Sequence, residues 1–306
     1  LALATTLGTS IISRAATADA LLNLWLALLF TDIARYILNP SDSLRLKVFL
    51  WLGLGILTKG PVAVIIPACA FSFWVLLSNQ WSLFWSAIQS WGGWALIIAL
   101  LTPWLIGVYD AQGYSFFENF ILLHNVERFS GNLHGHGGHP LYYLLVMPLV
   151  LLPYCGLAIA VLIRIREYWA CPINRFAVIW VAIVVILVSS SGTQLPHYIL
   201  YSTAPLFVLY ARVLPTLVSR LWALPGLFVP VSILGFGLLH HLLPEPNHLR
   251  DQEQLTMLLQ LMIEWRMPLA ASSLGLLILS LTALLVPKWQ LSQRLIALGC
   301  VQLACI

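Results

Sequence analysis

The chain carries polar residues able to do chemistry at a few places that interrupt long apolar runs. Asp19 closes the stretch Arg-Ala-Ala-Thr-Ala-Asp that begins at Arg14, and Lys59 lies between a threonine and a glycine. An ionisable group at the edge of an apolar segment needs a partner or water, which makes both residues candidates for a functional site. Asp19 is a candidate catalytic carboxylate, and Lys59, a compact charge with three donors, suits an anion such as a phosphate. The alternatives are a first-turn carboxylate that complements a helix dipole and a lysine that snorkels to lipid head groups.

The longest polar interval, residues 109–139, holds a second group of candidates. Its apolar and aromatic residues recur at near-helical spacing, which predicts an amphipathic helix on the membrane surface. Glu118 is a second candidate catalytic carboxylate, and His124, Asn125 and Arg128 are candidate substrate-binding residues. The guanidinium of Arg128 is able to clamp a phosphate in bidentate fashion. A solvated interfacial helix is the alternative.

Three histidines, His134, His136 and His139, follow among four glycines. Imidazoles at this spacing are able to hold a divalent metal, but no cysteine joins them and the usual catalytic spacings are absent. Substrate hydrogen bonding or plain loop chemistry is therefore favoured. The sequence predicts no definite cofactor and leaves a divalent metal open.

A third polar interval, Ser-Ser-Ser-Gly-Thr-Gln-Leu-Pro-His-Tyr at 189–198, comes just before another apolar run. Polar backbone at membrane depth normally lines a cavity. Gln194, His197 and Tyr198 are therefore candidate substrate-binding residues. An interfacial aromatic belt is the alternative use of the last two.

The elements that must position these residues are membrane helices. Of 306 residues 60% are hydrophobic and 8% charged, and mean hydropathy is +0.92, which excludes a water-soluble globule. The net charge of +4 forms no basic stripe, so nucleic acid is not a predicted partner. We predict an all-α polytopic transmembrane bundle in one domain, residues 1–306, with 109–139 as an external juxtamembrane helix and loop. It has about ten or eleven segments, at 1–12, 17–38, 46–58, 61–78, 91–108, 140–163, 176–190, 195–213, 222–243, 267–286 and 295–306.

Charge counting decides whether the chain turns near Lys59. With a turn there, ten of the fifteen cations fall on one side of the membrane, namely Arg35, Arg45, Lys47, Arg164, Arg166, Arg175, Arg212, Arg220, Lys288 and Arg294. The other side receives five cations and eight of the eleven acids, a clear positive-inside bias. A single span over 46–78 erases that bias and strands the lysine in hydrocarbon, at a cost of roughly 2.5–3.5 kcal/mol. The sequence therefore predicts a turn and places the polar intervals on the external face.

Four stretches in order, 14–19, 57–60, 116–143 and 192–198, resemble bacterial lipid-linked-sugar glycosyltransferases of the GT-C superfamily, in the group similar to aminoarabinose transferases and protein mannosyltransferases. The resemblance implies transfer of a sugar from a polyprenyl-phosphate donor to a lipid, glycan or protein acceptor. It places the reaction at the periplasmic face of the bacterial inner membrane, among membrane lipids. Lys59 and Arg128 meet its demand for cations near the departing phosphate.

The resemblance also implies that a first helix and a first external loop, with the general base, precede residue 1. The 306 residues are then an N-terminally truncated transferase that is inactive by itself. Two alternatives are a transporter or flippase of a lipid-linked sugar and an inactive remnant.

Overall fold

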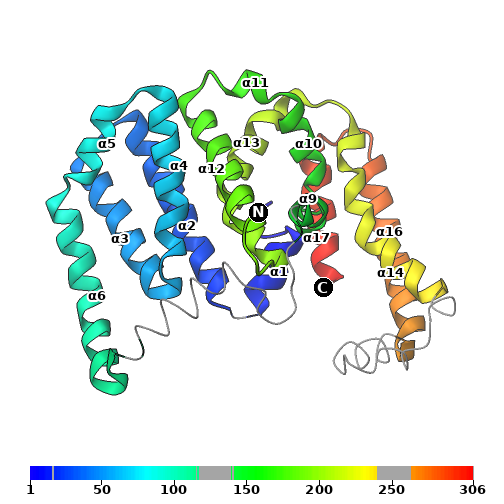
Figure 1. Ribbon diagram of the computed structural model, residues 1–306. Coiled ribbons are helices and arrows are strands. Elements are labelled where there is room, and N and C mark those ends of the chain that lie inside the picture. The colour runs from blue at the N-terminus through cyan, green and yellow to red at the C-terminus, as the bar shows by residue number, and fades with distance from the viewer. Residues whose placement is uncertain (16, 115, 117–138, 140, 240–262, 306) are drawn as a thin grey trace. The chain divides into compact units, whose positions relative to one another are not determined.

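The regular elements of the chain are helices. The computed structural model describes residues 1–15, 17–114, 116, 139, 141–239 and 263–305, and no strand occurs among them (Figure 1). Five described helical segments are long and apolar enough to cross a membrane: Ala18–Leu38, Trp91–Gln112, Pro172–Ser189, Pro196–Thr216 and Met267–Leu285. The predicted all-α membrane fold is confirmed.

The described residues form two compact units. The smaller comprises Leu1–Ser10, Leu151–Leu157 and Leu214–Ile306, and the larger comprises Ile11–Val150 and Ala158–Val213. The larger unit contains every described candidate of the predicted site. The assignment of 1–306 to a single domain stays a prediction.

The larger unit is built around α2 (Ala18–Leu38), which packs against α3 (Asp42–Lys59) and α4 (Val62–Ser78). The unit also contains α5 (Trp81–Ile88), α6 (Trp91–Gln112), α9 (Tyr142–Val150), α11 (Ile165–Tyr168), α12 (Pro172–Ser189), the 3-10 helix η3 (Pro196–Ser202) and α13 (Thr203–Val213). Two further helices, α1 (Leu7–Arg14) and α10 (Cys155–Ile163), have residues in both units.

An aromatic cluster forms the core of the larger unit. Phe30 of α2 stacks on Phe176 of α12 with ring centroids 5.4 Å apart, and both rings meet the edge or face of Trp180. Trp180 is fully buried, and its indole N–H donates to the carbonyl of Tyr201, 3.1 Å away. This hydrogen bond therefore fixes the position of η3 along α12.

The turn predicted near Lys59 is confirmed. Lys59 ends α3, and Gly60 caps it with φ +70° and ψ −140°, a conformation essentially restricted to glycine. The Gly60 N–H donates to the Ile56 carbonyl at 2.8 Å, and Pro61, which cannot donate, leads into α4.

The predicted start of the preceding segment, residue 46, was wrong. Ser41 caps α3 by accepting a hydrogen bond from the Leu44 N–H, so the helix begins at Asp42 and includes its charged first turn. At 18 residues it is about 27 Å long, close to the thickness of the hydrocarbon core.

Two other boundaries differ from the prediction. The expected single segment 140–163 is two helices, α9 and α10, separated by a turn at residues 151–154 that contains Pro153. The expected segment 222–243 begins as the 3-10 helix η5 (Arg220–Leu227) and continues as α14 (Phe228–Leu239). Apolar composition alone does not reveal such breaks, because the residues around them are as apolar as the helices.

The smaller unit pairs α14 with α16 (Arg266–Leu285) and packs α17 (Leu291–Ala304) against α16 and η5. The short 3-10 helix η4 (Leu214–Thr216) also belongs to it. Arg294 is buried, and its guanidinium donates to the carbonyls of Ala283, Leu284 and Val286 at the end of α16. A cation is favourable there, because the last carbonyls of a helix have no intrahelical partner.

Small residues let α3 and α4 approach each other closely. A Cβ added at Gly55 would lie 2.8 Å from the Cβ of Ala63, and both atoms are fixed to helix backbones. We expect Gly55→Ala to lower the unfolding free energy by about 1–3 kcal/mol through overpacking, relative to a helical glycine with open space.

Gly107→Ala on α6 serves as the matched control. A Cβ at this position meets nothing within 4 Å, so the change adds helix propensity only. Thermal unfolding in detergent compares the two variants. Equal midpoints would contradict the close approach.

Candidate functional site

A buried ion pair joins the start of α2 to the end of α3. The Nζ of Lys59 forms a salt bridge with the Oδ1 of Asp19, and the two side chains are only 22% and 11% exposed. Tyr201 of η3 completes a triangle: its hydroxyl donates to the same carboxylate oxygen and accepts from the lysine Nζ at 3.1 Å. Each member of the triangle contacts the other two.

Two more side chains of η3 surround this triangle. The Nε2 of His197 lies 3.4 Å from the Oδ2 of Asp19, so both carboxylate oxygens face a partner. The Nζ of Lys59 lies 4.8 Å from the ring centroid of Tyr198, within range of a cation–π interaction. The site therefore offers one cation held by a carboxylate and two tyrosines, with an imidazole on the other oxygen of that carboxylate.

Local structure explains how these residues meet. The link between α2 and α3 is only three residues long, so the helices run antiparallel and the first turn of one meets the last turn of the other. An acid at a helix N-terminus and a lysine at a C-terminus each complement the helix dipole. In a 3-10 helix residues three apart eclipse, which stacks Tyr198 on Tyr201 with centroids 5.8 Å apart.

Gln194 lies beside this cluster in sequence, but its amide binds backbone. Its Oε1 accepts from the His139 N–H at 3.1 Å, and its Nε2 donates to the Ser189 carbonyl at 3.0 Å. The hydroxyl of Tyr143 forms a second hydrogen bond to this loop, donating to the Leu195 carbonyl at 3.0 Å. The buried Gln194 thus fixes residue 139 to the loop before η3, and its role as a substrate ligand stays a prediction.

The structure brings together four predicted residues, Asp19, Lys59, His197 and Tyr198, and adds Tyr201, which sequence reasoning missed. The signal was the spacing of two tyrosines three apart after Pro196, which places both on one side of a helical turn. Other predicted residues lie outside the described residues: Glu118, His124, Asn125, Arg128, His134 and His136. In the part of the chain that the structure describes, no group of three or more His, Cys, Asp or Glu is placed to hold a metal ion.

Other cations of the larger unit lie at the opposite ends of these helices. Arg45, in the first turn of α3, donates to the carbonyl and hydroxyl of Ser86. Arg175, in the first turn of α12, donates to the hydroxyl of Ser78 at the end of α4. The two helix ends therefore differ in charge, as the predicted turn requires.

We expect the Asp19–Lys59 pair to show strong coupling. Asp19→Asn or Lys59→Met alone leaves one buried charge without its partner, at a cost of about 3 kcal/mol, whereas the double variant removes both charges. The decrease in unfolding temperature of the double variant is expected to be smaller than the sum of the decreases in the two single variants.

The measurement is thermal unfolding of the four proteins in detergent. Simple additivity would show that the two side chains do not depend on each other.

The helical fold matches crystal structures of ArnT, and together with the relatives found in sequence this confirms the resemblance predicted from the sequence. The crystal structure of ArnT from Cupriavidus metallidurans bound to undecaprenyl phosphate superposes with a TM-score of 0.77 at 21% identity, covering 99% of this chain and 56% of that one. Its apo state gives a TM-score of 0.69 at 19% identity, covering 93% and 52%.

In sequence the chain is similar to enzymes named undecaprenyl phosphate-alpha-4-amino-4-deoxy-L-arabinose arabinosyl transferase. The relative from Shewanella sediminis is 28% identical over 63% of this chain and 36% of its own length, and one from Sodalis glossinidius is 31% identical over 73% and 40%. The matched part of the chain thus covers well under half the length of these relatives. No protein-family model matches it.

Proposed function

We propose that the protein takes part in transferring a sugar from a polyprenyl-phosphate donor to an acceptor within the membrane. The observation that carries this proposal is the partly buried Lys59, held by Asp19 and Tyr201 at the end of an apolar helix bundle. The relatives are named as transferases that use such a donor, which favours transfer over transport. The acceptor, a lipid, glycan or protein, is left open.

Lys59 is the residue we assign to the donor phosphate. When the sugar leaves, its bond to the phosphate breaks and negative charge grows on the phosphate oxygens, so a fixed ammonium stabilises the transition state. The surrounding rings of Tyr198 and Tyr201 exclude water and strengthen that attraction. Arg128 is the second cation we propose for the same phosphate.

Asp19 fits the role of a counterion better than that of a general base. A base must present a lone pair within hydrogen-bond reach of the acceptor hydroxyl. Both oxygens of Asp19 already face donors, namely Lys59, Tyr201 and His197, and the side chain is nearly closed off. We propose that Asp19 orients the ammonium of Lys59, and that Glu118 serves the acceptor side.

We propose substrate contacts for the remaining candidates on the same face. His197 and Tyr198 lie next to the ion pair and are able to contact the donor head group. His124 and Asn125 precede Arg128 by four and three residues, and Gln194 supports the loop that leads into η3, the helix of His197.

Replacing Lys59 is expected to weaken donor binding. In the full-length protein, Lys59→Gln should weaken binding of undecaprenyl phosphate by about tenfold or more and lower the rate of sugar transfer by roughly 10²–10³-fold. Binding is measured by native mass spectrometry, and transfer with radiolabelled donor and a membrane-lipid acceptor fraction.

Lys47→Gln is the matched control, because this exposed lysine lies near the other end of the same helix. A Lys59→Gln protein that folds and binds the donor as well as the Lys47→Gln protein does would overturn the assignment.

We also propose that this site faces the periplasm and that the protein lies in the bacterial inner membrane. Support comes from the charges: the cationic first turns of α3 and α12 lie at the helix ends away from Lys59, as expected for cytoplasmic ends. Both termini of the predicted external interval 109–139 then lie on the side of Lys59.

Cysteine reporters test this orientation. In a variant without the five natural cysteines, a cysteine replacing the exposed His139 should react with a membrane-impermeant maleimide added to intact spheroplasts. One replacing the exposed Arg166 should react only after the membrane is opened. Labelling of both sites from the same side would refute the orientation.

A further inference from the structure

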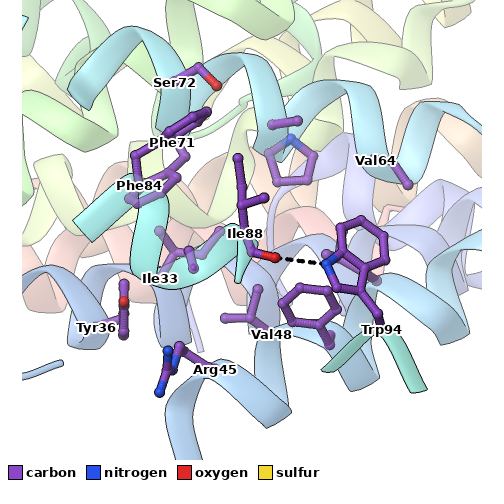
Figure 2. A pocket seen from close by; sticks show the side chains of 15 residues that line it. Ile33, Tyr36, Arg45, Val48, Val64, Phe71, Ser72, Phe84, Ile88 and Trp94 are labelled. Carbon is purple, nitrogen blue, oxygen red and sulfur yellow. Dashed lines mark hydrogen bonds between the residues drawn. The ribbon is translucent and has the colours of Figure 1, made fainter. Parts of the chain in front are cut away.

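An apolar cavity of about 260 Å³ lies among α2, α3, α4, α5 and the start of α6, within the larger unit (Figure 2). Its walls are aliphatic and aromatic side chains, among them Ile33, Val48, Leu52, Phe71, Phe84 and Trp94. Of the fifteen described residues that line it, Arg45 is the only charged one. Such a lining suits a hydrocarbon and offers one anchor for an anion.

The cavity is elongated along the helices. Arg45, Val48, Phe49 and Leu52 recur on one face of α3 and cover about 10 Å of its length. On α4 the lining residues run from Val64 to Ser72, about 12 Å. Arg45 stands at one end of this slot, close to the start of its helix.

The short helix α5 places that end at the membrane interface. It has no buried residue, and Trp81 and Trp85 are 42% and 54% exposed, as are tryptophans of an interfacial belt. Phe84, Ala87 and Ile88 of the same helix line the slot, and the Ile88 carbonyl accepts from the Trp94 indole (Figure 2). The slot therefore runs from the interface into the hydrocarbon region.

The charge at this end is available to an anion. Arg45 is 23% exposed; its Nη1 donates to the carbonyl and hydroxyl of Ser86, and its Nη2 pairs with Asp42, whose side chain is 84% exposed. A guanidinium has five N–H donors, so donors remain for an anion that approaches from the side of Asp42. An arginine is able to bind a phosphate through two parallel hydrogen bonds. Exposed Arg35, which pairs with Asp32, lies next to the lining residue Tyr36.

We infer that this slot binds one acyl chain of an anionic phospholipid, with the lipid phosphate on Arg45. The inference does not depend on the transferase activity, because Arg45 lies 14 residues before Lys59 on α3, about 21 Å away along the helix. A lipid held here is a structural ligand of the bundle end opposite the ion pair.

Native mass spectrometry of the full-length protein, delipidated in detergent and mixed with phosphatidylglycerol or phosphatidylcholine, tests the inference. The wild type should retain one phosphatidylglycerol in preference to phosphatidylcholine. Ala68→Phe, which places a ring in the slot, should lose this lipid, whereas Ala99→Phe, on the exposed face of α6 and outside the slot, should keep it.

Arg45→Gln leaves the apolar walls intact and should lower the preference for phosphatidylglycerol over phosphatidylcholine by about tenfold. Unchanged retention in a folded Ala68→Phe protein, or unchanged preference in Arg45→Gln, would overturn the inference. Displacement of the bound lipid by undecaprenyl phosphate, but not by phosphatidylglycerol, would overturn it too and assign the slot to a prenyl tail.

Discussion

The buried pair of Lys59 and Asp19 is the constraint on which the larger unit depends. A charge at the end of an apolar helix is costly unless a partner reaches it, and no partner lies near it in sequence. The antiparallel packing of α2 and α3 brings the carboxylate to the ammonium, and Gly60 lets the chain turn directly after the lysine. The interaction that stabilises the charge also fixes its position at the end of α3.

Support for this pair comes from the apolar core. Trp180 is packed by the phenylalanines of α2 and α12, and it binds the backbone of Tyr201, so the hydroxyl that bridges the ion pair is set by side chains deep in the bundle. Changes in the aromatic core therefore affect the site without touching it. The opposite end of the bundle is organised differently, by Arg45, exposed tryptophans and a cavity rather than by a closed ion pair. The two ends of one helix pair thus differ in structure.

Segment lengths and charges predicted most of the fold, because a helix that crosses hydrocarbon must be about 20 apolar residues long and cations gather on one side. They predicted the turn at Lys59 and the helices on both sides of it. They did not predict the early start of α3 at Asp42, which depends on a serine cap, or the break between α9 and α10. The short α5 was missed as well, because eight residues are too few to register as a span.

By itself the sequence determined the helical membrane class, the resemblance to lipid-linked-sugar transferases and the identity of four residues that meet at the site. These properties follow from composition, spacing and charge, which are local. Only the tertiary structure decided what each polar group contacts. Tyr201 reaches a carboxylate 182 residues away, and the amide of Gln194 is used by the backbone of residues 139 and 189. Contacts between residues so far apart in sequence depend on helix packing and on the eclipsed turns of a 3-10 helix. A hydrophobic pattern predicts neither of these.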